Sequence, residues 1–262
     1  MLVFLLSDYN DIESMRSLLN DECKIKAAFK CFNDEMSQRI YLRRLYSSLA
    51  FASLTVTFAD VMTTLQYYPD EIIRLLSEEE VFLDLGAYNG DTINQFIKMA
   101  NDHYKHIYAL EMDSAVYKEL KSNFIAQEKI TCFPYGASNK SAEVHYNNKG
   151  YASSSYIRVN KSDIANMPVA KLKSIDEMIT DGEITYTPTY IKMDIEGAEM
   201  DALQGLSQTI IKHKPKLAVC VYHSRHDLWR LPLYIKSLVP EYKMILRHHS
   251  SIHRETVMYA YI

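Results

Sequence analysis

The sequence predicts an α/β fold with a mainly parallel sheet that is flanked by helices. After about residue 80, short apolar runs alternate with helical patterns, and such alternation is typical of right-handed strand–helix–strand crossovers. The chain has 262 residues, of which 48% are hydrophobic and 24% charged, and its net charge is −4. These values indicate an ordinary globular protein with one full-sized core.

The predicted strands are apolar runs short enough to be buried on both faces of a sheet. They are Val81–Leu85, Ile107–Leu110, Ile130–Phe133, Tyr190–Met193, Leu217–Tyr222, Met244–Leu246 and Thr256–Ile262. The helical patterns between them are Thr92–Ala100, Ser114–Phe124, Ala198–Ile211 and Leu231–Leu238. The segment 136–173 is rich in Ser, Asn and Tyr, and we expect a loop or hairpin insertion there, near the ligand end of the sheet.

The first 79 residues have a different pattern. From about Asp11 to Glu80 there is no glycine, and apolar residues recur at spacings of three and four, which predicts helices. A last helix is expected over Glu71–Leu76, and the acidic run 78–80 is expected to be a solvated connection. We therefore predict an N-terminal helical subdomain, residues 1–79, and a ligand-binding domain, residues 80–262.

Composition excludes several classes of protein. No part of the chain has the basic excess that binding to phosphates requires, so we expect no nucleic-acid partner. Cys23, Cys31, Cys132 and Cys220 are scattered without a C-x-x-C pair, which predicts reduced core residues and a cytoplasmic protein. The apolar opening MLVFLL is too short for a signal peptide or a membrane span, so no stable membrane insertion is expected.

Gly86 and Gly90 lie four residues apart in the stretch VFLDLGAYNGDT, directly after the first predicted strand. Parallel sheets bind ligands outside the carboxyl ends of their strands, where the first strand-to-helix turn makes much of the backbone contact. A side chain at either glycine would block a ligand or strain the turn. The alternative is a tight turn that binds nothing.

The charges around this turn indicate which kind of ligand it binds. A dinucleotide site requires G-x-G-x-x-G and rests a pyrophosphate on the helix N-terminus. This turn instead has Asp84 before it and Asp91 at the helix start, and two carboxylates would repel a pyrophosphate. S-adenosylmethionine carries an ammonium and a sulfonium charge and no phosphate, so it fits better.

Two further positions complete the predicted cofactor site. Glu111 follows the second strand and can accept both ribose hydroxyls, although a nucleotide ribose or a helix cap would also explain it. Gly136 and Ala137 follow the third strand, and their small size leaves room for adenine. The predicted cofactor-binding residues are Asp84, Gly86, Ala87, Tyr88, Gly90, Asp91, Thr92, Glu111, Met112, Gly136, Ala137 and Asp194.

The candidate catalytic residues follow two later strands. In IKMDIEGAEMDAL, Asp194 and Glu196 project from the end of the strand expected beside the first one. Asp194 can act there as a general base or orient a substrate hydroxyl, whereas capping of the next helix is the alternative role of Glu196 and Glu199. His223 follows the next strand and is an alternative base. With His226 it forms an H-x-x-H pair, but no metal site is predicted.

The segments DLGAYNGDT, YALEMD, KLKSIDEMI, YIKMDIEGAEMDALQGL and KLAVCVYH, in this order, resemble the motifs of FkbM-type S-adenosylmethionine-dependent methyltransferases. The resemblance extends from about residue 80 to the C-terminus, and KMDIEGAE is its most specific part. It implies a Rossmann-like class I methyltransferase fold, with a seven-stranded sheet whose last hairpin is reversed. It also implies O-methylation of hydroxyls on sugars, glycans or related natural products.

By this resemblance, Asp84, Gly86 and Gly90 fall on the cofactor loop, Glu111 on the ribose-binding acid and Asp194 at the active-site strand end. The commonest methyltransferase pattern has glycine where this chain has Tyr88. We therefore expect the loop to turn differently there, with Tyr88 covering part of the cofactor.

The predicted function is that of an S-adenosylmethionine-dependent O-methyltransferase with a small-molecule or glycan acceptor. Two alternatives stay open: a nucleotide-cofactor oxidoreductase or epimerase, and a non-catalytic methyltransferase-like binding module. The residues do not identify the acceptor, the role of the N-terminal helices or any need for a divalent ion, and they leave a homo-oligomer open.

Overall fold

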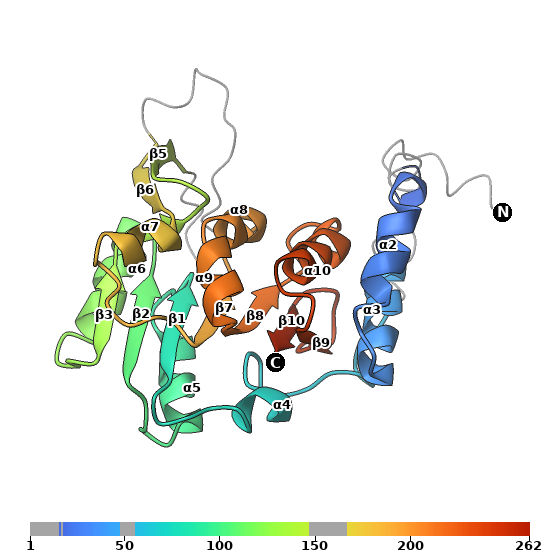
Figure 1. The fold of residues 1–262 in the computed structure, drawn as a ribbon, viewed down its shortest axis with the longest axis horizontal. Coiled ribbons are helices and arrows are strands. Elements are labelled where there is room, and N and C mark those ends of the chain that lie inside the picture. The colour runs from blue at the N-terminus through green and yellow to red at the C-terminus, as the bar shows by residue number, and fades with distance from the viewer. Residues whose placement is uncertain (1–15, 17, 48–55, 147–166) are drawn as a thin grey trace. The chain divides into compact units, whose positions relative to one another are not determined.

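The computed structural model describes residue 16 and residues 18–47, 56–146 and 167–262 (Figure 1). The opening MLVFLL, the start of the N-terminal helical pattern and the centre of the 136–173 insertion lie outside these residues. None of the described helices is long and apolar enough to cross a membrane.

The main sheet has seven strands in the order β3-β2-β1-β7-β8-β10-β9. They are β1 (Val81–Leu85), β2 (His106–Leu110), β3 (Ile130–Phe133), β7 (Tyr190–Met193), β8 (Lys216–Cys220), β9 (Lys243–His248) and β10 (Thr256–Tyr261). The pairs β1–β2, β2–β3, β1–β7 and β7–β8 are parallel, whereas β9 and β10 are antiparallel. The predicted fold class is therefore confirmed, including the reversed last hairpin.

The described helices follow the predicted alternation closely. They are α2 (Glu22–Phe29), α3 (Glu35–Ser47), α4 (Asp70–Ile73), α5 (Asp91–Met99), α6 (Ser114–Asn123), α7 (Ile175–Thr180), α8 (Glu199–Gln204), α9 (Ser207–His213) and α10 (Asp227–Leu238). Local capping explains where two of them begin: the Asp113 carboxylate caps α6 and the Ser174 hydroxyl caps α7.

Three predicted helices have different bounds in the structure. The helix expected over Glu71–Leu76 is the shorter α4, which ends at Ile73. The expected helix 198–211 is divided into α8 and α9, because the Gly205 carbonyl accepts hydrogen bonds from the Ser174 hydroxyl at 2.8 Å and from the Asp176 N–H at 2.9 Å. Helix α10 begins at Asp227 instead of Leu231. The Asp227 carboxylate accepts the Ser224 N–H at 3.0 Å and so provides the start signal.

A second sheet of three strands follows β3 along the chain. Strands β4 (Tyr135–Ala137), β5 (Ala142–His145) and β6 (Val169–Lys173) lie in the order β4-β6-β5. The β5–β6 pair is antiparallel, so the described part of the predicted insertion is a hairpin. Strand β4 adds to it in parallel with β6.

Contacts divide the chain into two compact units, one of residues 70–219 and one of residues 1–69 with 220–262. This division does not coincide with the predicted boundary between a helical subdomain and a ligand-binding domain after residue 79. That boundary stays a prediction. In the second of these units, α2 packs against α10 and α3 against β9. The N-terminal helices therefore share a unit with the last hairpin.

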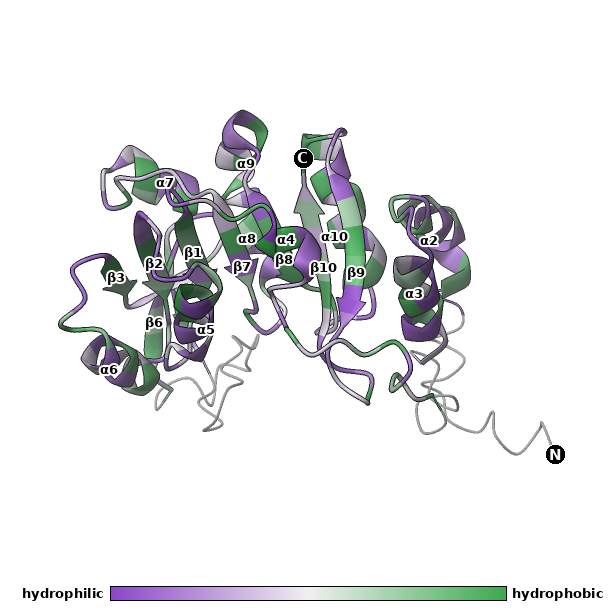
Figure 2. Ribbon diagram, turned by 90° about the horizontal axis from the view of Figure 1, so that it is seen from below, coloured by the Kyte–Doolittle hydropathy of each residue, from purple (hydrophilic) through white to green (hydrophobic). Residues whose placement is uncertain are grey.

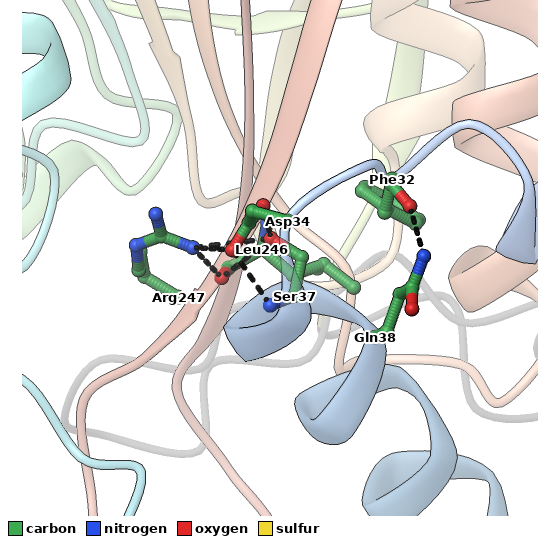
Figure 3. Close-up of polar contacts among 6 residues, drawn as sticks. All are labelled: Phe32, Asp34, Ser37, Gln38, Leu246 and Arg247. Atoms are coloured by element: carbon green, nitrogen blue, oxygen red, sulfur yellow. Dashed lines mark hydrogen bonds and ion pairs between the residues drawn. The ribbon is translucent and has the colours of Figure 1, made fainter.

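Helix α3 covers the open edge of β9 (Figure 3). The Ser37 hydroxyl accepts the Leu246 N–H at 2.7 Å and lies 3.3 Å from the Leu246 carbonyl. Asp34 accepts hydrogen bonds from the Ser37 N–H at 2.9 Å and from the Arg247 guanidinium at 3.1 Å. Side chains thus satisfy backbone groups that an edge strand would otherwise leave open to pairing with another chain.

The core lies along the strands, and Figure 2 shows β10 as largely hydrophobic. Every residue of β1 and β7 is buried. Phe82 of β1 stacks on Phe96 of α5 with ring centroids 4.5 Å apart. Two residues of these buried strands are charged, Asp84 and Lys192, and they belong to the candidate site described below.

Two predictions about individual residues were wrong. Glu80 is not part of a solvated connection: it is buried, its carboxylate lies 3.0 Å from the Lys216 ammonium, and the Thr189 hydroxyl donates to it. This ion pair compensates the cost of burying the charge. Of the four cysteines, Cys220 is buried as predicted, but Cys23 is exposed because it lies on the outer face of α2.

We predict that Ser37→Ala lowers the free energy of unfolding by about 1–3 kcal/mol, because it leaves the Leu246 N–H without its acceptor at the sheet edge. Urea unfolding measures this loss. The control is Ser237→Ala, since the Ser237 hydroxyl is exposed and donates only to a carbonyl of its own helix. Its unfolding free energy should change by less than about 0.5 kcal/mol, and an equal loss in both variants would contradict the edge role of Ser37.

Candidate active site

The candidate site is built on the turn between β1 and α5. The N–H groups of Gly86 and Ala87 both donate to the Leu110 carbonyl at 3.0 Å, which ties the turn to the end of β2. The Gly90 N–H closes the turn by donating to the Ala87 carbonyl at 2.8 Å. Helix α5 then begins at Asp91, as predicted, with Gly90 as its N-cap residue.

Both glycines are required by the packing of the protein itself. Gly86 and Gly90 have φ values of +78° and +91°, which favour glycine. A Cβ atom on Gly86 would lie 2.1 Å from the Asp194 carbonyl oxygen, and one on Gly90 would lie 2.1 Å from the Phe124 ring. The sequence interpretation explained the pair by access for a ligand. The structure adds that the close approach of neighbouring segments excludes any side chain there.

Tyr88 lies in the same turn and adopts the left-handed conformation, with φ of +47°. Glycine adopts this conformation without strain. The expectation that the loop turns differently at Tyr88 stays a prediction. The backbone is held there by the Glu111 carboxylate, which accepts the Tyr88 N–H at 3.1 Å. Coverage of the cofactor by Tyr88 stays a prediction.

Asp84 and Lys192 form a buried ion pair at the centre of the site. They face each other across the parallel pair of β1 and β7, with the Lys192 ammonium 2.9 Å from one Asp84 carboxylate oxygen. The same ammonium donates to the Gly86 carbonyl at 2.6 Å. Lys192 therefore links the acid of β1 to the first residue of the turn.

Two further carboxylates, those of Asp91 and Asp194, act on this pair. Burial raises the pKa of Asp84 to about 6 against the opposing effect of Lys192, and the negative charges of Asp91 and Asp194 raise it further. The end of β1 therefore carries a concentration of negative charge at neutral pH. Such an environment favours a cationic ligand and disfavours a phosphate.

Glu111 follows β2 and is held by backbone groups on both sides. Its carboxylate accepts the Tyr88 N–H at 3.1 Å and the Asp113 N–H at 2.8 Å. Burial raises the pKa of Glu111, while these two hydrogen bonds lower it. Asp113, not Glu111, caps α6, so Glu111 is free of the capping role that was its alternative explanation. Binding of ribose hydroxyls by Glu111 stays a prediction.

The structure brings three other predicted cofactor residues together beside the second sheet. Gly136 and Ala137 lie in β4. A Cβ atom on Gly136 would lie 2.6 Å from the Leu172 side chain and 3.4 Å from Met112, so Met112 is a close neighbour. Ala137 is buried. In the main turn, the Thr92 N–H donates to the Asp91 carboxylate at 2.7 Å, and Thr92 is buried.

Asp194 follows β7, which lies beside β1 as predicted. Its N–H donates to the Leu85 carbonyl at 3.2 Å, so its backbone is fixed against the start of the glycine turn. Glu196 has a φ of +56°, a conformation that costs energy in a residue other than glycine and is enriched at functional sites. Glu199 is buried in the first turn of α8 and accepts the Ile195 N–H, which precedes the helix, at 3.1 Å. The N-cap residue of α8 is Ala198, whose side chain makes no capping hydrogen bond, so the capping role considered for Glu199 stays a prediction.

His223 follows β8 and belongs to the unit that contains residues 220–262. Its ring lies 4.2 Å from that of Tyr222. His226 is the N-cap residue of α10 and packs edge-on against Trp229. The role of His223 as an alternative base stays a prediction.

Lys192 is the residue of this site that sequence reasoning missed. A signal for it exists in the sequence, since Asp84 and Lys192 are the lone charges inside two apolar runs predicted to be neighbouring strands. Buried charges are rarely unpaired. Opposite charges in adjacent buried strands therefore predict an ion pair, provided that the register between the strands is known.

The fold and the acid-lined strand ends define the class: this is an α/β protein with the class I methyltransferase-like fold. Residues 84–251 match the sequence profile described as the methyltransferase FkbM domain. The chain therefore belongs to the FkbM methyltransferase domain family, as the sequence motifs predicted.

Solved structures agree with this assignment. The crystal structure of the methyltransferase FkbM from Methylobacillus flagellatus has a TM-score of 0.76 and 25% sequence identity, over 94% of this chain and 60% of that one. This chain thus spans less than two thirds of the length of that relative. Among curated proteins, none matches the sequence significantly.

Two other solved structures are more distant. An rRNA methylase from Streptococcus thermophilus has a TM-score of 0.45 and 12% identity, over 74% of this chain and 93% of that one. The precorrin-6y C5,15-methyltransferase from Geobacter metallireducens has a TM-score of 0.42 and 10% identity, over 78% of this chain and 95% of that one. These likenesses are too weak to inform substrate choice.

We predict that Gly86→Ala destabilises the protein far more than Gly182→Ala. Both glycines have positive φ values, but no atom lies within 4 Å of a Cβ built on Gly182, whereas a Cβ on Gly86 meets the Asp194 carbonyl. Gly182→Ala should cost about 1–2 kcal/mol from conformation alone. Gly86→Ala should cost more than about 3 kcal/mol, measured by urea unfolding. Equal costs would show that β1 and β7 can separate freely at this turn.

Proposed function

We propose that this protein is an S-adenosylmethionine-dependent methyltransferase that transfers a methyl group to a hydroxyl oxygen of a sugar, a glycan or a related small natural product. Membership of the FkbM family supports the reaction class. The observation that carries the proposal for this chain is Asp84, a fully buried carboxylate at the ligand end of β1.

The residues of the site fit this cofactor. Among the described residues, the Lys192 ammonium at 2.9 Å is the one donor beside the Asp84 carboxylate, so acceptor capacity remains there. A buried acceptor in this state favours a ligand that brings donors and positive charge. The ammonium group of S-adenosylmethionine has both properties. Glu111 would hold the ribose hydroxyls, and the small residues Gly136 and Ala137 would flank the adenine.

In this reaction, the protein has to position the cofactor and the acceptor and to accept the proton of the acceptor hydroxyl. The bound cofactor supplies a methyl group activated by its sulfonium charge. Held by Asp84 and Glu111, it would give that methyl group to the acceptor oxygen and keep the electron pair of the broken carbon–sulfur bond. Asp194 accepts the proton of the hydroxyl or orients it, since a carboxylate at this position can act as a general base. Glu196 and His223 are the alternative groups for this step.

The choice of acceptor rests on the family resemblance. A nucleotide-cofactor oxidoreductase is disfavoured by the three acids around the glycine turn, which would repel a pyrophosphate. A binding module without catalysis remains the second candidate. A module that binds no cationic ligand has no requirement for a carboxylate buried at this position.

We predict that the purified protein binds S-adenosylhomocysteine with micromolar affinity and does not bind NAD. The reason is the negative charge at the end of β1, which attracts the amino-acid ammonium and repels a pyrophosphate. Calorimetric titration with each ligand is the measurement. Binding of NAD alone would contradict the proposed methyltransferase class. Binding of neither ligand would favour the alternative of a non-catalytic binding module.

We predict that Asp194→Asn retains affinity for S-adenosylhomocysteine within about tenfold but lowers turnover by about 100-fold or more, the usual scale for loss of a general base. Turnover is measured as transfer of labelled methyl groups to an acceptor found by screening sugars and glycans. Asp201→Asn is the matched control, because Asp201 lies seven residues further on, in α8, and should leave turnover unchanged. Wild-type turnover in Asp194→Asn would transfer the base role to His223 or Glu196.

A further inference from the structure

Lys192 is a lysine buried in the middle of the sheet, within a strand whose other residues are apolar. The alignment of β1 with β7 sets Lys192 directly opposite Asp84, so both side chains lie on the same face of the sheet. The Lys192 ammonium reaches the Asp84 carboxylate at 2.9 Å and the Gly86 carbonyl at 2.6 Å. One cation therefore contacts both the acid and the glycine turn.

A second ion pair in the same unit, between the buried Glu80 and the partly exposed Lys216, shows what a purely structural arrangement looks like. Glu80 and Lys216 are 3.0 Å apart at the amino ends of β1 and β8, the opposite end of the sheet. The Glu80 carboxylate also accepts hydrogen bonds from the Thr189 hydroxyl and, at 3.2 Å, from the Ser77 N–H. Its acceptor capacity is used by the protein.

The Asp84 carboxylate differs from Glu80 in this respect. It is fully buried, and its close cationic partner is the Lys192 ammonium at 2.9 Å, which also donates to the Gly86 carbonyl. Among the described residues, no donor other than Lys192 reaches the Asp84 carboxylate. Acceptor capacity therefore remains for a ligand at this end of the strand.

We propose that Lys192 is a positioning residue of the cofactor site: it holds Asp84 in the ionised form that receives the ammonium group of the cofactor, and it anchors the glycine turn through the Gly86 carbonyl. This inference rests on the proposed function, because it assigns Lys192 a role in binding that cofactor. Lys192 acts through Asp84 and Gly86.

The charges that face Asp84 give this role a measurable pH dependence. They are Lys192 of β7, Asp91 of α5 and Asp194 after β7, and burial together with the two acids raises the pKa of Asp84 to about 6. Because the ligand ammonium requires the ionised carboxylate, affinity should fall as the pH drops through about 6. Removal of Lys192 takes away the opposing positive charge, so the pKa of Asp84 should rise and the fall in affinity should begin at higher pH.

The test is calorimetric titration of S-adenosylhomocysteine into the wild-type protein, Lys192→Met and Lys216→Met, from about pH 5.5 to 8.5. Methionine keeps the unbranched shape of most of the lysine side chain and removes its charged end. Lys192→Met should bind at least about tenfold more weakly at pH 7, with the midpoint of its pH profile about one unit higher or more. Lys216→Met also breaks an ion pair with a buried carboxylate, but it should keep the wild-type profile.

Several results would overturn the inference. A wild-type affinity and pH profile in Lys192→Met would do so while leaving the proposed function intact, and so would an equal shift in Lys216→Met. Failure of the wild-type protein to bind S-adenosylhomocysteine would overturn the proposed function and this inference with it.

A second variant serves if Lys192→Met shows no cooperative unfolding transition in urea. The double variant Asp84→Asn with Lys192→Met removes both buried charges, so it avoids an uncompensated carboxylate in the sheet. It should fold, bind weakly and show no pH-dependent change in affinity near pH 6. Wild-type affinity in this double variant would overturn the role assigned to Lys192.

Discussion

The candidate site depends on the close approach of β1 and β7 at their carboxyl ends. The Asp194 N–H donates to the Leu85 carbonyl, and the Asp194 carbonyl lies where a side chain of Gly86 would be. These backbone contacts leave no room between the two strand ends. They therefore fix the relative positions of the glycine turn and the acid proposed as the base, which two independent loops could not do with the same accuracy.

A buried charge follows from the same geometry. Because β1 and β7 pair in parallel with Asp84 opposite Lys192, the core of the sheet contains an ion pair where an apolar pair would be less costly. Such pairs add little stability, since desolvation opposes the attraction. The pair is better explained by its position at the ligand end of the sheet. There Asp84, Asp91 and Asp194 together create a negative field, which suits the proposed cationic cofactor.

In the unit formed by residues 1–69 and 220–262, the N-terminal helices protect the edge of the main sheet. Strand β9 is the last strand of the sheet, and its open edge would be a place for pairing with other chains. Helix α3 lies against it, and Ser37 and Asp34 bond with Leu246 and Arg247. The N-terminal helices therefore have at least one structural task, protection of the sheet edge, apart from any part in selecting an acceptor.

The sequence by itself determined the class of fold, the strands and the place of the site. Apolar runs bounded by glycines and acids are local signals, and the motif around Asp194 is specific enough to predict the family. Only the tertiary structure decided how the residues are used. The left-handed turn at Tyr88, the burial of Glu80 and the pairing of Lys192 with Asp84 depend on strand register and on contacts between residues distant in the chain. Local sequence patterns do not predict those contacts, because a charged residue is solvated or buried depending on which distant segment packs against it.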